Sequence, residues 1–264
     1  MNKHDLVDRY GPVALVTGAS SGIGMSFAKL LAANGLDVVV VARRVDRLNE
    51  LAANLTKAHA VKVTVCEVDL SAGTAAQRIL DATSALDIGL IVSNAGFGLK
   101  GPYTDGDPAT LSEMLMVNCH TTMQLARGFV PRLQQRGKGG KGGLVFTSSV
   151  EGLIGCPYSA AYAASKAFVN SFGEALWGEL TPEGIDVLTL CPGATDTEAP
   201  RKQGIDPATM RNVMSPDDVA RLTMDNIRNG PVYIPSEHYK ATFERLLSMP
   251  RRDAIAAMAK SMKK

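Results

Sequence analysis

Short runs of apolar, mostly β-branched residues alternate along this chain with longer stretches in which apolar residues recur at helical spacing, such as Leu48, Leu51 and Leu55. The runs lie at 13–16, 38–41, 61–65, 88–92, 144–146, 185–190 and 232–234. Strands that lie parallel need a crossover between them, usually a helix. The sequence therefore predicts an α/β fold with a single doubly wound parallel sheet of about seven strands and helices on both faces.

The boundaries of one helix are well signalled near the carboxyl-terminal end. Ser215 is a typical N-cap residue, Pro216 suits the first helical position, and Asp217 and Asp218 lie where the helix dipole favours acids. We expect Gly230 to end this helix.

Length and charge limit the classes of function. The 264 residues, 45% of them hydrophobic, suffice for one domain that spans 1–264. A formal charge of +2 gives no basic field for nucleic acid. The first residues lack a signal-peptide core and no apolar run is long enough to cross a bilayer, so we expect a cytoplasmic protein. The scattered cysteines and histidines predict no metal site.

The segment TGASSGIG at 17–24 directly follows the first predicted strand and has two interpretations. With Ser20 between Gly18 and Gly22, it matches the nucleophile elbow of a serine hydrolase, which would also need an acid and a histidine later in the chain. As a glycine-rich turn at a helix start, it suits a bound phosphate. The serine of a nucleophile elbow normally follows a strand that several other strands precede, whereas Ser20 follows the first predicted strand. This position favours the phosphate-binding interpretation.

Polar residues far downstream support a dinucleotide site. Tyr162 and Lys166 lie four apart in a predicted helix at 158–180 and share one face, where an ammonium lowers the pKa of a neighbouring phenol. Ser149 ends another predicted strand, as do Asn94-Ala95-Gly96 and Pro192-Gly193. Ligands bind at this carboxyl edge of open α/β sheets.

Taken together, these motifs resemble the classical short-chain dehydrogenase/reductase family, in order and with the family's spacing, from about residue 11 to 235. The resemblance implies a Rossmann-type fold and an oxidoreductase that passes a hydride between a nicotinamide cofactor and a carbonyl or secondary alcohol. Tyr162 would be the acid/base, Lys166 would lower its pKa and hold the ribose, Ser149 would bind the substrate oxygen, and Asn118 would anchor a water. The expected cofactor-binding residues are Gly18, Ser20, Ser21, Gly22, Ile23, Gly24, Arg43, Arg44, Asp69, Leu70, Asn94, Ala95, Gly96, Tyr162, Lys166, Pro192, Gly193 and Thr197.

The end of the second predicted strand bears on cofactor choice. Ala42 stands where relatives that prefer NAD carry aspartate, and Asp37 lies at the opposite end of the strand. Arg43 can pair bidentately with a ribose 2′-phosphate, assisted by Arg44 and Ser20, so we expect NADP(H) to be preferred over NAD(H).

Apolar residues near the predicted site suggest an apolar alcohol or ketone as the small-molecule substrate, although each could equally belong to the core. They are Phe97, Leu99, Leu153, Ile154, Tyr158, Met210 and Met214. The segment 194–214 is long enough to form a substrate lid.

Two further features concern assembly. The small residues of the helix that carries Tyr162 allow close packing, and the family resemblance places such a helix in a homodimer or homotetramer. The tail at 236–264 is expected to be helical, with an apolar stripe of Tyr239, Phe243, Leu246 and Leu247 and a basic end. A contact with a membrane surface is one interpretation of the tail, and packing on its own fold or on a partner subunit is favoured.

Three function classes therefore stand. The first is an NADP(H)-dependent oxidoreductase of apolar small molecules, the second a serine hydrolase that uses Ser20, and the third a non-catalytic cofactor-binding protein of the same fold.

Overall fold

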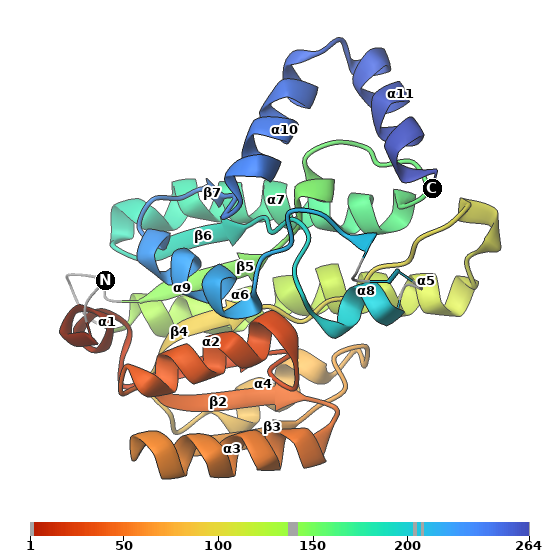
Figure 1. Ribbon diagram of the computed structural model, residues 1–264. Coiled ribbons are helices and arrows are strands. Elements are labelled where there is room, and N and C mark those ends of the chain that lie inside the picture. Colours follow the sequence, from red (N-terminus) through yellow and green to blue (C-terminus); the bar gives the residue numbers. More distant parts are fainter. Residues whose placement is uncertain (1–2, 137–141, 203–204, 207–208, 264) are drawn as a thin grey trace.

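A computed structural model describes residues 3–136, 142–202, 205–206 and 209–263. Seven parallel strands form one sheet in the order β3-β2-β1-β4-β5-β6-β7 (Figure 1). Their bounds are β1 Val13–Thr17, β2 Asp37–Ala42, β3 Val63–Glu67, β4 Ile88–Ser93, β5 Gly143–Thr147, β6 Asp186–Leu190 and β7 Val232–Tyr233. The chain order reverses between β1 and β4, which places the topological switch point at their carboxyl ends. The predicted fold class is confirmed.

Helices cover both faces of the sheet. On one face pack α1 Lys3–Tyr10, α2 Gly22–Ala33, α3 Val45–His59 and α9 Pro216–Asn226. On the other pack α4 Ala75–Ala82, α6 Thr122–Gln134 and α7 Ala160–Leu180. Helix α5 Pro108–Leu115 runs through a π-helical segment, Met116–Thr121, into α6. Short 3-10 turns lie at Tyr103–Asp105, Val150–Gly152 and Thr181–Glu183.

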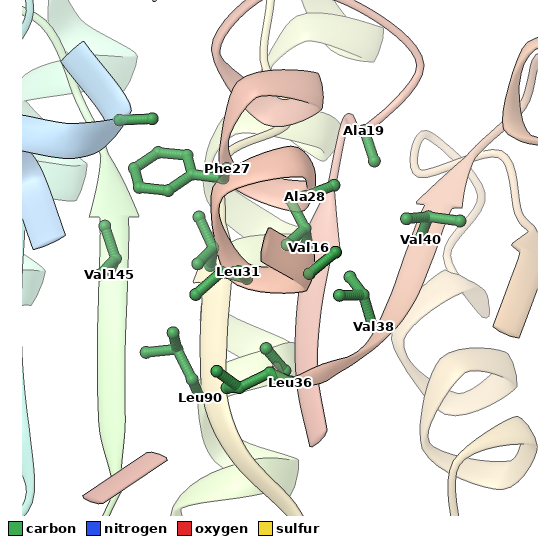
Figure 2. Packing of buried hydrophobic residues seen from close by; sticks show 14 of the residues in the cluster. Val16, Ala19, Phe27, Ala28, Leu31, Leu36, Val38, Val40, Leu90 and Val145 are labelled. Carbon is green, nitrogen blue, oxygen red and sulfur yellow. The ribbon is translucent and has the colours of Figure 1, made fainter. Parts of the chain in front are cut away.

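Successive strand residues belong to opposite cores. Val16 and Val40 face α2, whereas Leu15 and Val39 face the helices of the other layer. Figure 2 shows Phe27, Ala28 and Leu31 of α2 in the cluster that also contains Val16 and Val40. Both faces of the strands are thus buried, which explains why the runs are apolar throughout and do not alternate with polar residues.

The predicted end of one helix is wrong. Helix α9 begins after Ser215, which accepts a hydrogen bond from the Asp218 amide as expected, but it ends at Asn226 and not at Gly230. The glycine serves another purpose. A Cβ at Gly230 would lie 2.4 Å from the Val187 carbonyl oxygen and 2.6 Å from the Trp177 ring, so close packing requires glycine there.

The predicted helical tail consists of α10 Glu237–Ser248 and α11 Arg251–Met262, the helices labelled at the top of Figure 1. Phe243 and Leu246 are buried against residues of the strand ends, among them Val150 and Cys191. Packing on its own fold, one of the two favoured predictions for the tail, holds for these side chains, but Leu247, expected in the same stripe, is 47% exposed. Among the described residues, no helix has both the length and the apolarity needed to cross a membrane.

The segment 194–214 leaves the end of β6 and carries the short helix α8 Glu198–Lys202. Its two ends are tied together, because the Asp196 amide donates to the Met214 carbonyl and the Met214 amide donates to the Ala194 carbonyl, each at 3.0 Å. Residues 203–204 and 207–208 of the predicted lid lie outside the described part of the chain.

Candidate active site

The glycine-rich segment forms a tight turn between β1 and α2. Gly18 and Gly22 have φ values of +68° and +55°, a region that favours glycine. A Cβ on Gly24 would lie 2.4 Å from the Gly18 carbonyl oxygen. The turn ends at the N-terminus of α2, where Ser21 makes no side-chain capping bond among the described residues. The free backbone amides at the start of α2 and the dipole of this helix fit an anion such as a pyrophosphate.

Hydrogen bonds join the carboxyl ends of three strands next to this turn. The Thr17 hydroxyl accepts from the amides of Asn94 and Ala95, each at 3.0 Å, and the Asn94 side chain donates to the Thr17 carbonyl at 3.1 Å. The Thr147 hydroxyl donates to Asn94 Oδ1 at 3.3 Å. This network fixes the switch point of the sheet.

Asn118 lies in the π-helical segment and is 1% exposed. Its side chain exchanges hydrogen bonds with the backbone of Phe97 at 3.1 and 3.0 Å and donates to the Ser165 hydroxyl at 2.9 Å. A Cβ on Gly96 would lie 3.0 Å from both Asn118 Oδ1 and Lys166 Nζ. The structure therefore brings together three residues that the sequence spaces far apart.

Ser149, Tyr162 and Lys166 also meet, as predicted. The Ser149 hydroxyl lies close enough to the Tyr162 phenol to lower its pKa. Lys166 Nζ lies 5.8 Å from the centroid of the Tyr162 ring and donates to the Thr147 carbonyl at 2.8 Å. A phenol, a hydroxyl and an ammonium at one strand edge can bind a carbonyl oxygen and exchange a proton with it.

The pKa of Tyr162 departs from the sequence-based expectation. The Lys166 ammonium was expected to lower it, but the pKa of Tyr162 is raised well above its usual value, chiefly by burial and next by the charge of Glu151, while the Ser149 hydrogen bond lowers it. Burial also lowers the pKa of Lys166 to about 8. The side chain of Lys166 is 3% exposed, so removal from water disfavours its charge.

This buried ammonium predicts a pH-dependent stability. The Lys166 pKa is about 8 in the folded chain and 10.5 in its ordinary state, so the unfolded chain binds more protons between these values and stability rises with pH there. Relative to Lys166→Met, the wild type should gain about 3 kcal/mol of unfolding free energy from pH 7.5 to 10.5. Urea unfolding of both proteins across this range measures it, and a constant difference would contradict it.

Two arginines follow β2, but only one reaches the glycine turn. Arg44 donates from Nε and Nη2 to the Ser20 hydroxyl at 3.1 and 2.9 Å and from Nη2 to the Ser21 hydroxyl at 2.6 Å. Arg43, which the sequence favoured, is 67% exposed and pairs with Glu113 at 3.2 Å. The Ser20 hydroxyl thus accepts hydrogen bonds from arginine nitrogens, which does not favour a hydrolase nucleophile.

The other predicted residues lie along the same edge. Asp69 is exposed and accepts from the amide and hydroxyl of Ser71, and the Leu70 carbonyl accepts from the Thr121 hydroxyl at 2.7 Å. The Pro192 carbonyl accepts from the Val150 amide at 3.2 Å.

Three residues near the site were not predicted as site residues. The Tyr239 ring from α10 lies against Gly193, where a Cβ would come within 2.1 Å of it. Glu151 accepts from the Ser159 hydroxyl at 2.7 Å and pairs with Lys100 at 3.2 Å. Glu198 pairs with Arg44 at 2.8 Å. The position of Glu151, two residues after Ser149, is a weak sequence signal that it lies near the site. Tyr239 and Glu198 have no such signal, because long-range packing brings them to the site.

Comparison with known proteins identifies the family of this chain. A model of the short chain dehydrogenase family matches residues 12–207. The chain belongs to this family. It is 31% identical over 254 residues to a 7beta-hydroxysteroid dehydrogenase of Clostridium sardiniense, which covers 96% of each chain.

Solved structures of family members superpose well. A short-chain dehydrogenase from Sphingobium yanoikuyae in complex with NADPH has 32% identity and a TM-score of 0.82 over 94% of this chain and 95% of that one. A short-chain dehydrogenase/reductase from Burkholderia phymatum in complex with NAD has 26% identity and a TM-score of 0.79, over 89% and 92%. The family resemblance is confirmed, and a dehydrogenase fold that takes a nicotinamide cofactor follows from it. One of these two structures holds NADPH and the other holds NAD.

Proposed function

We propose that this protein is an NADP(H)-dependent oxidoreductase that interconverts a carbonyl and a secondary alcohol on an apolar small molecule. The observation that carries the proposal is the placement of Ser149 and Lys166 beside Tyr162 at the carboxyl edge of the sheet. The alternative of a non-catalytic protein of the same fold is disfavoured, because such a protein has no need of this arrangement.

The residues fit a nicotinamide dinucleotide. The turn at 18–24 would hold the pyrophosphate, Asn94, Ala95 and Gly96 would border the ribose next to Lys166, and Pro192, Gly193 and Thr197 would border the nicotinamide. Asp69 and Leu70 would border the adenine. When bound, the cofactor supplies or accepts a hydride at its nicotinamide ring.

The proton moves on the protein side of the reaction. In reduction, the Tyr162 hydroxyl donates its proton to the oxygen that becomes the alcohol, and Ser149 donates a hydrogen bond that stabilises the developing charge. The raised pKa of Tyr162 suits the role of a proton donor in this direction. Asn118, held by Phe97 and Ser165, would anchor the water that returns the proton.

An apolar substrate agrees with the surroundings of the site. Leu153, Ile154 and Tyr239 belong to the apolar cluster that also contains Phe243 and Leu246 of α10 and Met258 of α11. One relative is named for a hydroxysteroid. Another, of which the chain spans 54%, is a very-long-chain 3-oxoacyl-CoA reductase from Debaryomyces hansenii, 32% identical over 187 residues. We propose a bulky apolar ketone or alcohol on this basis.

The proposed assembly is a homodimer or homotetramer in the cytoplasm that contacts neither nucleic acid nor membrane. Phe168 on α7 is 39% exposed and stacks on Phe172 with ring centroids 5.8 Å apart, an apolar surface on the helix expected at the interface.

The cofactor preference is tested by turnover with each cofactor. We expect kcat/KM with NADPH to exceed that with NADH by about tenfold or more, because a bound phosphate–arginine pair contributes on the order of 1.5–3 kcal/mol. A panel of bulky ketones, followed at the nicotinamide absorbance, measures it. Arg44→Ala should remove most of the preference and Arg43→Ala little of it. A clear NADH preference of the wild type would contradict the proposal.

A further inference from the structure

One acidic side chain of the segment after β6 lies on the arginine next to the glycine turn. Glu198, the first residue of α8, accepts from Arg44 Nη1 at 2.8 Å and also from Arg47 Nη1. About a third of each side chain of the Arg44–Glu198 pair is exposed, at 32% and 33%. The pair joins positions separated by 154 residues in sequence.

The remaining donors of Arg44 point into the turn. Nε and Nη2 contact the hydroxyls of Ser20 and Ser21, so the guanidinium is fixed at the side of the turn. Carboxylate and phosphate oxygens both accept charge-assisted hydrogen bonds from a guanidinium. Glu198 Oε2 accepts such a bond from Arg44 Nη1, and an oxygen of a ribose 2′-phosphate would make the same type of contact.

The same segment also contacts the turn by packing. Thr197, which precedes Glu198, lies so close to Gly22 that a Cβ there would come within 2.9 Å of the threonine methyl group. The start of the segment and the phosphate-binding turn are thus linked by van der Waals contact and by charge. A phosphate that displaced Glu198 from Arg44 would therefore move the residue next to Thr197, which itself packs on Gly22.

We infer that Glu198 is a cofactor-selectivity residue whose carboxylate competes with the 2′-phosphate of NADP(H) for Arg44. This inference rests on the proposed preference for NADP(H) and deepens it, because Glu198 would set how large that preference is. NAD(H) has a free 2′-hydroxyl and no phosphate, so it would leave the Arg44–Glu198 pair intact.

The expected effect is moderate because the pair is partly exposed. Partly exposed ion pairs are worth little, so loss of the competing carboxylate should tighten binding of a 2′-phosphate by roughly three- to tenfold. Screening should reduce this gain at high salt. Binding of a nucleotide without the 2′-phosphate should change by less than about twofold.

The test uses titration calorimetry of the full chain with adenosine 2′,5′-bisphosphate and with 5′-AMP, so turnover does not enter. We expect Glu198→Gln to bind the bisphosphate three- to tenfold more tightly than the wild type and 5′-AMP equally. Equal or weaker binding of the bisphosphate by Glu198→Gln would overturn the inference. Equal tightening for both nucleotides would also overturn it, because the effect would then not concern the 2′-phosphate.

The chain offers a matched control in Glu113→Gln, which removes the carboxylate that pairs with Arg43. This variant should bind both nucleotides as the wild type does. Tightening of the bisphosphate by Glu113→Gln alone would assign the phosphate to Arg43 and overturn the role of Glu198. Failure of the proposed function would give a different result. The wild type would then bind 5′-AMP as tightly as the bisphosphate, whatever the ratio of bisphosphate affinities between Glu198→Gln and the wild type.

Discussion

Replacement of Tyr162 by phenylalanine should abolish turnover, with a loss in kcat of about a thousandfold or more. The change removes one hydroxyl, which is the proton donor of the proposed reaction and lies close to Ser149. Positioned acids and bases contribute roughly 10²–10⁴-fold, and the same hydroxyl also stabilises the developing charge. Steady-state rates with the best ketone of the panel measure the effect.

A lost hydroxyl must be separated from a damaged fold. Cofactor affinity, followed by protein fluorescence, should change by less than about threefold in Tyr162→Phe, because the ring and Lys166 remain in place. Tyr103→Phe removes a hydroxyl from a side chain that is 68% exposed and should leave the rate unchanged. Near-normal turnover of Tyr162→Phe would remove the assigned acid/base and favour the non-catalytic alternative.

A methyl group at Gly24 should impair both stability and cofactor binding. The added Cβ would lie 2.4 Å from the Gly18 carbonyl oxygen and 2.5 Å from Asn94 Nδ2, and the first of these atoms is backbone that cannot rotate away. Overpacking of this kind costs about 1–3 kcal/mol. Because the displaced atoms form the phosphate turn, we expect Gly24→Ala to bind cofactor roughly tenfold or more weakly.

The matched control is Gly178→Ala. A Cβ at Gly178 meets nothing within 4 Å, and the residue lies inside α7. Alanine there should stabilise the fold by about 0.8–1 kcal/mol through helix propensity and leave binding unchanged. Thermal unfolding and fluorescence titration of both variants provide the comparison. Wild-type cofactor affinity in Gly24→Ala would show that the turn does not bind the pyrophosphate.

Local pattern predicts much of this fold because the information is local. The period of apolar residues and the N-cap at Ser215 depend on neighbours a few positions away, and the structure confirms the strands and this cap. Parallel strands also align their carboxyl ends, so Ser149, Asn94 and Gly193 are brought to one edge by topology alone. The prediction that Gly230 ends α9 is wrong because this glycine is required by close packing against Trp177 and Val187, which are distant in sequence.

The sequence by itself determined the sheet, the glycine turn and the identities of the residues at its edge. Only the tertiary structure decided which of them interact and in what electrostatic surroundings. Spacing places Lys166 beside Tyr162, but burial, which depends on the whole fold, raises the tyrosine pKa and lowers that of the lysine. Arg43 and Arg44 are adjacent in sequence, and strand pairing together with partners such as Glu113 and Glu198 directs only Arg44 to the turn. Charged residues that are far apart in sequence are brought into contact by tertiary packing, which no local sequence pattern predicts.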